Sequence, residues 1–221
     1  MADVWWARPV DPGAAPALVA VLDDHERTRL DRFRREADRA RYLAAHALTR
    51  LVLGAHLGAD PAALVLDRTC RCGEQHGKPT LPSGPEFSLT HSGDRVGVAL
   101  STAGPIGLDV EEHRPLSDLD GLASHVLSPA ERHRPPRDAT AFLAVWTRKE
   151  ALLKASGDGL SKPMDAITLD ASGSVLTWTD GPAEAWVVDL DARGRPAAVA
   201  GLGSPPPAIR THDGDALLGS V

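Results

Sequence analysis

The chain is poor in aromatic residues and in cysteine. Aromatic side chains make up 4% of its 221 residues, and the only two cysteines are Cys70 and Cys72. A structural zinc site usually takes four ligands from two suitably spaced pairs, so two thiols one residue apart do not predict one. Side chains at that spacing point to opposite faces of an extended chain, which also disfavours a disulfide. We therefore expect two free thiols in a reducing cytoplasm.

Other absences exclude further classes of protein. No apolar run approaches the 18 residues of a membrane-spanning helix, and the N-terminus lacks the basic-then-apolar pattern of a signal peptide. A formal net charge of −6 argues against non-specific binding to nucleic acid. The hydrophobic fraction of 43% is sufficient for a folded core, so we expect a globular protein.

The charge is unevenly distributed. Residues 25–50 hold eight arginines and four acidic residues. Such a basic stretch in an acidic protein suggests an anionic partner, such as a phosphate-bearing ligand or an acidic protein. The alternative is a helical surface on which most of these arginines pair with nearby Asp and Glu side chains, and for most of them we favour it.

Two long helices stand out in the pattern of apolar residues. Apolar side chains recur every three or four residues from 37 to 56, and Gly58 ends this stretch. A second helix is predicted at 138–155, before Gly157. Short apolar or alternating runs predict strands, at 4–7, 65–68, 86–90, 96–101, 106–111, 167–170, 175–178, 186–189 and 197–201. Helices and mainly antiparallel strands together indicate an α+β fold.

Two carboxylates share one face of the strand predicted at 106–111. Because side chains alternate along a strand, Asp109 and Glu111 lie on one side and Glu112 on the other. Like charges this close are costly unless water or a cation separates them. Hard oxygen ligands of this kind suit Mg²⁺. A solvated acidic strand would give the same pattern, so these two residues alone do not decide between the readings.

An unusual set of side chains lies on one face of the second long helix. Trp146, Glu150 and Lys154 are four residues apart, so they stack along the helix. A core tryptophan beside a surface Glu–Lys pair is the simplest interpretation. Glu150 could equally be the third carboxylate of a metal site.

Three sequence blocks, taken together, resemble one known family. The blocks are Gly77-Lys78-Pro79 with Phe87-Ser-Leu-Thr90-His91-Ser92-Gly93; Gly107-Leu-Asp109-Val-Glu111; and Trp146-x-x-Lys149-Glu150-Ala-x-x-Lys154-x-x-Gly157-x-Gly159-Leu160. In order and spacing the chain resembles the 4′-phosphopantetheinyl transferases of the monomeric, double-length class. That class activates carrier domains of peptide and polyketide synthetases.

The resemblance implies a fold. It implies an α+β protein of two pseudo-symmetric halves, each a long helix packed on a small antiparallel sheet, with the active site at their junction. The expected division is 1–104 for the half that binds the nucleotide of coenzyme A, and 105–203 for the half with the metal and the catalytic helix. Residues 204–221 match nothing in the family, and we expect a flexible tail there.

The resemblance also implies a reaction and its residues. The enzyme would transfer the phosphopantetheine arm of coenzyme A to a serine of an apo acyl or peptidyl carrier protein, releasing adenosine 3′,5′-bisphosphate. It implies Mg²⁺ on Asp109, Glu111 and Glu150, with Glu150 and Lys154 as catalytic residues. The ligands implied for coenzyme A are Lys78, Thr90, His91, Arg29, Arg32 and Lys154, with Arg27 as an equal candidate in the loosely aligned basic stretch.

Two other functions remain open from the residues. Three acids and a lysine would also serve another metal-dependent phosphotransferase or hydrolase, although no phosphate-binding glycine motif supports one. A non-catalytic module that binds carrier proteins is the second alternative. It predicts loss of Glu150 or Lys154, and both are present.

Overall fold

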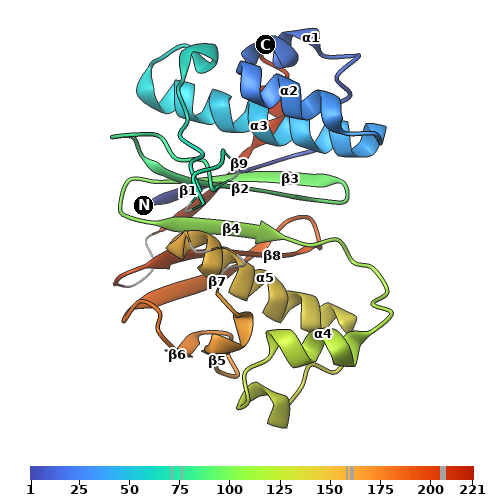
Figure 1. Ribbon diagram of the computed structural model, residues 1–221, viewed down its shortest axis with the longest axis vertical. Coiled ribbons are helices and arrows are strands. Elements are labelled where there is room, and N and C mark those ends of the chain that lie inside the picture. Colours follow the sequence, from blue (N-terminus) through green and yellow to red (C-terminus); the bar gives the residue numbers. More distant parts are fainter. Residues whose placement is uncertain (71, 76, 158, 160–161, 205–207) are drawn as a thin grey trace. The chain divides into compact units, whose positions relative to one another are not determined.

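The chain forms two compact units. The computed structural model describes all residues except 71, 76, 158, 160–161 and 205–207 (Figure 1). Unit 1 consists of Met1–Thr102 and Ile209–Val221, and unit 2 of Ala103–Ala208. Leu160, which ends the third sequence block, lies outside the described residues. None of the helices in the described part of the chain has the length and apolar character needed to span a bilayer.

Unit 1 is built on a four-stranded sheet. Its strands are β1 (Ala2–Ala7), β2 (Glu86–Ser92), β3 (Arg95–Ser101) and β9 (Ile209–Asp213), in the order β2-β3-β1-β9. β3 is antiparallel to both of its neighbours, whereas β1 and β9 are parallel. Its helices are α1 (Pro16–Val21), α2 (Asp24–Arg32), α3 (Glu36–Leu57) and α6 (Gly214–Leu218), with a short 3₁₀ turn η1 at Pro61–Ala63.

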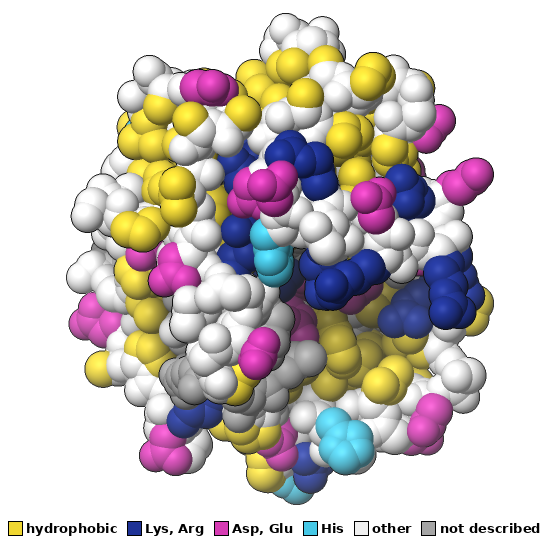
Figure 2. All heavy atoms as spheres, turned by 45° about the horizontal axis from the view of Figure 1, so that its top comes forward, with side chains coloured by type: hydrophobic (Ala, Val, Ile, Leu, Met, Phe, Trp, Pro, Cys, Tyr) yellow, Lys and Arg dark blue, Asp and Glu magenta, His cyan; other side chains and the backbone are white. Residues whose placement is uncertain are grey.

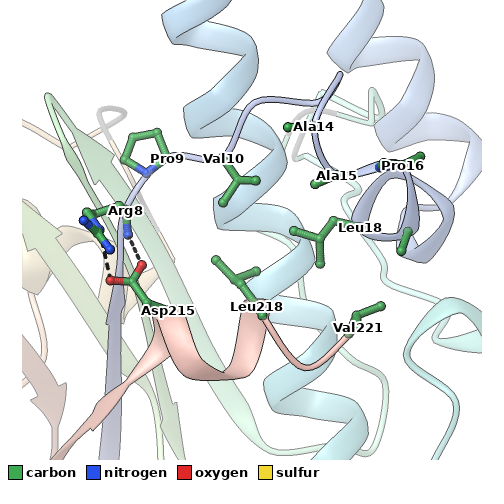
Figure 3. A pocket seen from close by; sticks show the side chains of 12 residues that line it. Arg8, Pro9, Val10, Ala14, Ala15, Pro16, Leu18, Asp215, Leu218 and Val221 are labelled. Atoms are coloured by element: carbon green, nitrogen blue, oxygen red, sulfur yellow. Dashed lines mark hydrogen bonds and ion pairs between the residues drawn. The ribbon is translucent and has the colours of Figure 1, made fainter.

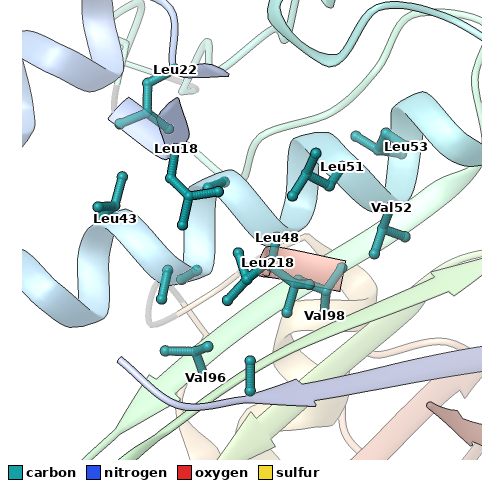
Figure 4. Packing of buried hydrophobic residues seen from close by; sticks show 14 of the residues in the cluster. Leu18, Leu22, Leu43, Leu48, Leu51, Val52, Leu53, Val96, Val98 and Leu218 are labelled. Carbon is teal, nitrogen blue, oxygen red and sulfur yellow. The ribbon is translucent and has the colours of Figure 1, made fainter. Parts of the chain in front are cut away.

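The core of unit 1 lies between α3 and the sheet. Alternate residues of β3, including Val96 and Val98, point toward α3, as the two-residue period of a strand requires. Leu48 and Val52 of α3 pack in the same cluster (Figure 4). Gly58 ends α3 with φ +63°, a left-handed conformation that favours glycine. The predicted helix at 37–56 is therefore confirmed.

The C-terminal segment corrects one expectation. We expected residues 204–221 to form a flexible tail, but Ile209–Asp213 pairs with β1 along its length as β9. α6 follows, and its Leu218 is buried in the core of unit 1. The polar sequence concealed this strand because its side chains meet polar partners: Arg210 and His212 both contact the carboxylate of Asp3. This pairing also makes the sheet mixed rather than purely antiparallel.

A second expectation fails at residues 65–68. Leu66 and Arg68 are buried while Val65 is 79% exposed, so the segment alternates as a strand does. In the described residues it forms only an isolated bridge, between Asp67 and Thr80. Alternating burial shows only that one side of a segment faces the core. A strand also needs a neighbouring strand to pair with, which the sequence of this segment does not reveal.

Unit 2 has a three-stranded and a two-stranded sheet. β4 (Ile106–Val110), β8 (Pro196–Leu202) and β7 (Ala185–Asp191) form an antiparallel sheet in that order, and β5 (Ile167–Leu169) pairs with β6 (Val175–Trp178). The helical elements among the described residues of this unit are α4 (Leu119–Val126), η2 (Glu131–His133), α5 (Ala139–Ser156) and η4 (Met164–Ala166). α5 packs across β4 and β8 (Figure 1). The side chain of Asp138 caps the start of α5, and Gly157 ends it with φ +76°.

Candidate active site

Gly107 brings α5 directly against β4. A methyl group on this residue would lie 1.9 Å from the carbonyl oxygen of Ala151 and 2.5 Å from the amide nitrogen of Ala155. Both are backbone atoms of α5, so no side chain at position 107 could be accommodated without moving the helix. Because Asp109 is two residues further along the strand, its side chain lies on the same face, toward α5.

Asp109 meets Lys154 on that face. The Nζ atom of Lys154 donates to Oδ1 of Asp109 at 2.7 Å and to the carbonyl oxygen of Leu108 at 3.0 Å. Asp109 is 5% exposed, so this charge-assisted contact is shielded from water. Lys154 lies in the last turn of α5, where a positive charge is also favoured by the helix dipole.

Glu150 lies one helical turn before Lys154 and is part of the same electrostatic group. Its pKa is raised above the ordinary value, first by burial and then by the negative charge of Asp109, with a further contribution from Glu111. Lys154 opposes this shift. Glu111 follows β4 and continues its ladder, since its N–H donates to the carbonyl of Pro196 at 2.9 Å. Unit 2 thus brings together the four residues predicted for metal binding and catalysis.

The chemistry of these carboxylates fits a hard divalent cation. All three offer oxygen ligands. Burial is the first cause of the raised pKa of Glu150, and repulsion from Asp109 and Glu111 adds to it; a cation would relieve that repulsion. Their side chains are not arranged as a ready-made coordination shell, however. Among the described residues, no group of three or more His, Cys, Asp or Glu side chains is close enough to hold a metal ion.

Lys149, next to Glu150 in the sequence block, has a different environment. It is fully buried, and its Nζ donates to Glu131 at 2.6 Å and to the carbonyl oxygens of Val126 and Ile167, each at 2.7 Å. Glu131 also accepts from the backbone N–H groups of Ser128 and Leu169. Lys149 therefore joins α5 to the end of α4 and to β5, and the motif serves structure as well as chemistry.

In unit 1, Thr90 and His91 lie on opposite faces of β2. Thr90 is 3% exposed, whereas the neighbouring His91 is exposed near the turn into β3. His91 shares its face with Phe87 and Leu89, the residues that pack toward the core beneath α3. The two predicted ligands thus reach different surroundings.

Arg41 joins this end of β2, although it was not among the predicted site residues. Its guanidinium donates to the carbonyl oxygen of Gly93 at 3.1 Å, two residues after His91, and pairs with Asp38. Arg41 is in the second turn of α3. The sequence shows that Arg41 lies at the start of the long helix. It does not predict the contact with Gly93, because the two residues are 52 positions apart.

Lys78 and the predicted arginines lie on other elements of unit 1. The Nζ of Lys78 is 4.0 Å from a carboxylate oxygen of Glu86, the first residue of β2. Arg29 and Arg32 are exposed in the last turn of α2. The structure places all of these cations in unit 1.

Half of the arginines in the basic stretch at 25–50 form ion pairs, fewer than the simpler interpretation required. Four of its eight arginines form ion pairs with acidic side chains: Arg27 with Asp24, Arg39 with Asp31, Arg41 with Asp38, and Arg50 with Asp23 and Glu26. Lys and Arg side chains are interspersed with Asp and Glu on the face seen in Figure 2. Because four of its eight arginines are paired with carboxylates, the stretch does not form a uniformly basic surface.

A separate hollow in unit 1 does not involve the predicted site residues. It has a volume of about 670 Å³ and lies between the segment after β1 and α6. Apolar side chains such as Val10, Leu18 and Leu218 line it, and the ion pair between Arg8 and Asp215 borders one side (Figure 3).

Comparisons with known proteins identify the family. Residues 105–200 match the model of the 4′-phosphopantetheinyl transferase superfamily. The 4′-phosphopantetheinyl transferase HetI of Nostoc sp. is 36% identical over 169 residues, which cover 71% of this chain and 69% of the relative. The chain belongs to the 4′-phosphopantetheinyl transferase superfamily.

Two Bacillus subtilis proteins extend the similarity over a comparable length. A 4′-phosphopantetheinyl transferase is 29% identical over 173 residues, covering 75% of this chain and 74% of the relative. The 4′-phosphopantetheinyl transferase Sfp is 26% identical over 173 residues, with the same coverage. The resemblance to this family seen in the sequence motifs is thereby confirmed. Its members are transferases that use coenzyme A.

Proposed function

We propose that this phosphopantetheinyl transferase uses the Asp109–Glu111–Glu150–Lys154 group of unit 2 to move the 4′-phosphopantetheine arm of coenzyme A to a carrier-protein serine. The observation that carries this assignment is the contact between Lys154 and Asp109, with Glu150 one turn away on the same helix. A cation and three carboxylates in mutual electrostatic reach suit a phosphoryl transfer, which depends mainly on positioning and charge stabilisation.

Mg²⁺ is the cofactor that these carboxylates would hold, through Asp109, Glu111 and Glu150. When bound, the ion would neutralise charge on the pyrophosphate of coenzyme A. Lys154 supports the same end, because its ammonium can bind phosphate oxygens from a position already fixed by Asp109.

Glu150 is the proposed acceptor of the serine proton. The serine oxygen forms a new bond to the phosphorus that carries the pantetheine arm. The bond from that phosphorus to the bridging oxygen breaks, and adenosine 3′,5′-bisphosphate leaves with that oxygen. Burial, the first cause of its raised pKa, makes Glu150 a better proton acceptor than an exposed carboxylate.

Unit 1 would bind the nucleotide end of the same coenzyme A. Lys78 and His91 are proposed to contact its phosphates, with Thr90, Arg29 and Arg32 as further ligands. Arg41 joins this set because it lies beside the turn that follows His91. Several cations suit a ligand that carries a 3′-phosphate in addition to its pyrophosphate.

The pseudo-symmetry of the two halves also remains a proposal. What supports it is that each unit contains one long helix packed on a sheet, α3 in unit 1 and α5 in unit 2. The protein is further proposed to act as a monomer, and its protein substrates are proposed to be apo acyl or peptidyl carrier proteins.

Intact-protein mass spectrometry tests the function. An apo carrier protein is incubated with this chain, coenzyme A and Mg²⁺, and in parallel with a Glu150→Gln variant and an Arg137→Met variant. Arg137 is an exposed cation of unit 2 outside the proposed site. We expect a mass gain of one phosphopantetheine with the native chain and Arg137→Met, and strongly reduced modification with Glu150→Gln.

Other outcomes would assign a different role. Breakdown of coenzyme A without a gain in carrier mass would indicate a hydrolase. Stable binding of carriers, both peptidyl and acyl, without modification would indicate a non-catalytic binding protein. A Glu150→Gln variant as active as the native chain would remove Glu150 from the reaction.

A further inference from the structure

A buried charge cluster lies in unit 1, at the base of the loop that carries Lys78. Its members are Arg50, which is fully buried, Glu26, which is 1% exposed, and Arg68, which is 8% exposed, together with Asp23. The guanidinium of Arg68 donates to Asp23 at 2.9 Å and to Glu26 at 2.7 Å. Arg50 donates to the same two carboxylates from α3.

The backbone of Arg68 anchors the Lys78 loop. The N–H of Gly77 donates to the carbonyl oxygen of Arg68 at 2.7 Å, and Asp67 and Thr80 exchange a pair of hydrogen bonds at 2.9 and 2.8 Å. Lys78 lies between these two anchor points. Its position therefore depends on where the 67–68 segment is held.

Gly77 shows how closely the two segments approach. A methyl group there would lie 3.0 Å from the carbonyl oxygen of Arg68 and 3.1 Å from that of Thr69. Both contacts are to backbone oxygens and are tighter than ordinary van der Waals contact. A methyl group at position 77 would therefore require the loop and the backbone at Arg68 and Thr69 to move apart by a few tenths of an ångström.

The carboxylates that hold Arg68 also start α2. Asp23 caps the helix by accepting from the N–H of Glu26 at 2.8 Å, and Glu26 accepts from the N–H of Asp23 at 3.1 Å. Arg29 is one turn further along this helix. The same two side chains thus fix the Lys78 loop on one side and the helix that carries Arg29 on the other.

Stability alone is a weak reason to bury this many charges. Desolvating two guanidinium groups and two carboxylates costs free energy, and well-packed apolar side chains often stabilise a fold as much or more. Hydrogen bonds are directional, unlike apolar contacts. Those from Arg68 to Asp23 and Glu26 therefore fix the position of Arg68 relative to the first turn of α2.

We propose that Arg68 is a positioning residue for Lys78. By bridging Asp23 and Glu26 it holds the loop at a fixed place relative to α2, so that Lys78 is already oriented to bind an anionic phosphate of coenzyme A. This inference rests on the proposed function of Lys78 as a ligand of coenzyme A. A lysine that is already held in place loses less conformational entropy when it binds, so the protein should bind coenzyme A more tightly.

A double-mutant cycle between Arg68 and Lys78 tests the proposal. Binding of coenzyme A in the presence of Mg²⁺ is measured by titration calorimetry for the native chain, Arg68→Lys, Lys78→Ala and the double variant. Lysine keeps the charge of Arg68 but cannot reach both carboxylates in the same geometry. We expect Arg68→Lys to weaken binding about tenfold, and to weaken it less than about twofold once Lys78 is absent.

Steady-state kinetics add a readout that a general structural defect would not reproduce. The KM for coenzyme A should rise in Arg68→Lys, whereas kcat at saturating coenzyme A should stay within about twofold, because the Asp109–Lys154 group is untouched. Arg8→Lys is the matched control, since Arg8 forms an exposed ion pair with Asp215 in the same unit. It should bind coenzyme A as the native chain does.

Gly77→Ala provides a second route if Arg68→Lys does not fold. It leaves the charge cluster intact and moves only the loop, so it should raise the KM in the same way and should also lose its effect when Lys78 is absent. Equal losses with and without Lys78, for whichever variant folds, would overturn the proposal. Failure of the native chain to bind coenzyme A at all would instead overturn the proposed function on which it rests.

Discussion

The ammonium group of Lys154 lies 2.7 Å from Oδ1 of Asp109, and the backbone carbonyl of Leu108 accepts a second hydrogen bond from it. The last turn of α5 is thereby tied to β4 by a side chain that family resemblance places among the catalytic residues. Glu150 lies one turn away and responds to both charges. Structure and proposed chemistry therefore depend on the same contact.

Replacing Lys154 should reduce the rate of transfer. Lys154→Met removes the cation but keeps much of the apolar side chain, and we expect kcat to fall on the order of 100-fold, the usual cost of losing one electrostatic stabiliser of a transition state. The measurement is the rate of carrier-protein modification at saturating coenzyme A. Arg137→Met, which removes an exposed cation from the same unit, should leave the rate unchanged. An unaffected rate in Lys154→Met would exclude Lys154 from catalysis.

Gly107→Ala should separate α5 from β4. The added methyl group would meet backbone atoms of Ala151 and Ala155, so the helix must shift, at a cost of about 1–3 kcal/mol in the free energy of unfolding. Activity should fall further than stability explains, because the shift moves Glu150 and Lys154 relative to Asp109. Gly13→Ala is the control, since a methyl group there meets only the side chain of Asp11, at ordinary contact distance. Native-like stability of Gly107→Ala would contradict the close approach.

Lys149→Met should destabilise the protein more than it alters the chemistry. It leaves the carboxylate of Glu131 and two backbone carbonyls without their common donor in a buried site, and breaking such a pair usually costs about 3–5 kcal/mol. Urea unfolding measures the effect. Lys162→Met, in the same unit but less buried, should cost far less. A loss below about 1 kcal/mol would show that this contact contributes little to stability.

The sequence was most informative where a period or a cap determines local structure. The two long helices were predicted to within two residues at each end, because apolar spacing and the glycines at 58 and 157 act locally. The motifs also singled out Asp109, Glu150 and Lys154. Gly107 could have been assigned a role from the same strand, since a glycine two residues before Asp109 lies on the same face.

Long-range contacts could not be predicted in this way. β9 was taken for a flexible tail because its strand partner, β1, is about 200 residues away in the sequence and its exposed residues are polar. The roles of Arg41 and Arg68 could not be predicted for the same reason. Arg41 contacts Gly93, and Arg68 contacts Asp23 and Glu26, all of which are distant in the sequence. Such contacts depend on the packing of whole elements.

Glu26 should make the stability of unit 1 sensitive to acid. Burial alone would raise the pKa of Glu26, but His46 and Arg50 outweigh this effect and lower the pKa from 4.5 to about 2. Arg68 and Asp23 also face this carboxylate. A depressed pKa in the folded state contributes stability that is fully present above pH 4.5 and is lost as the pH falls toward 2.

The expected size of this contribution is about 3 kcal/mol. Urea unfolding of the native chain and of Glu26→Gln, from pH 7 down to pH 3, measures it. The native chain should be the more stable at pH 7, and the difference should narrow steadily below pH 4.5, because protonation of Glu26 and its replacement by glutamine both remove the same charge beside Arg50. Asp24→Asn, at a side chain that is 98% exposed, should show no comparable narrowing. A difference between native and Glu26→Gln that stays constant across this range would mean that Glu26 is not held ionised by the cluster.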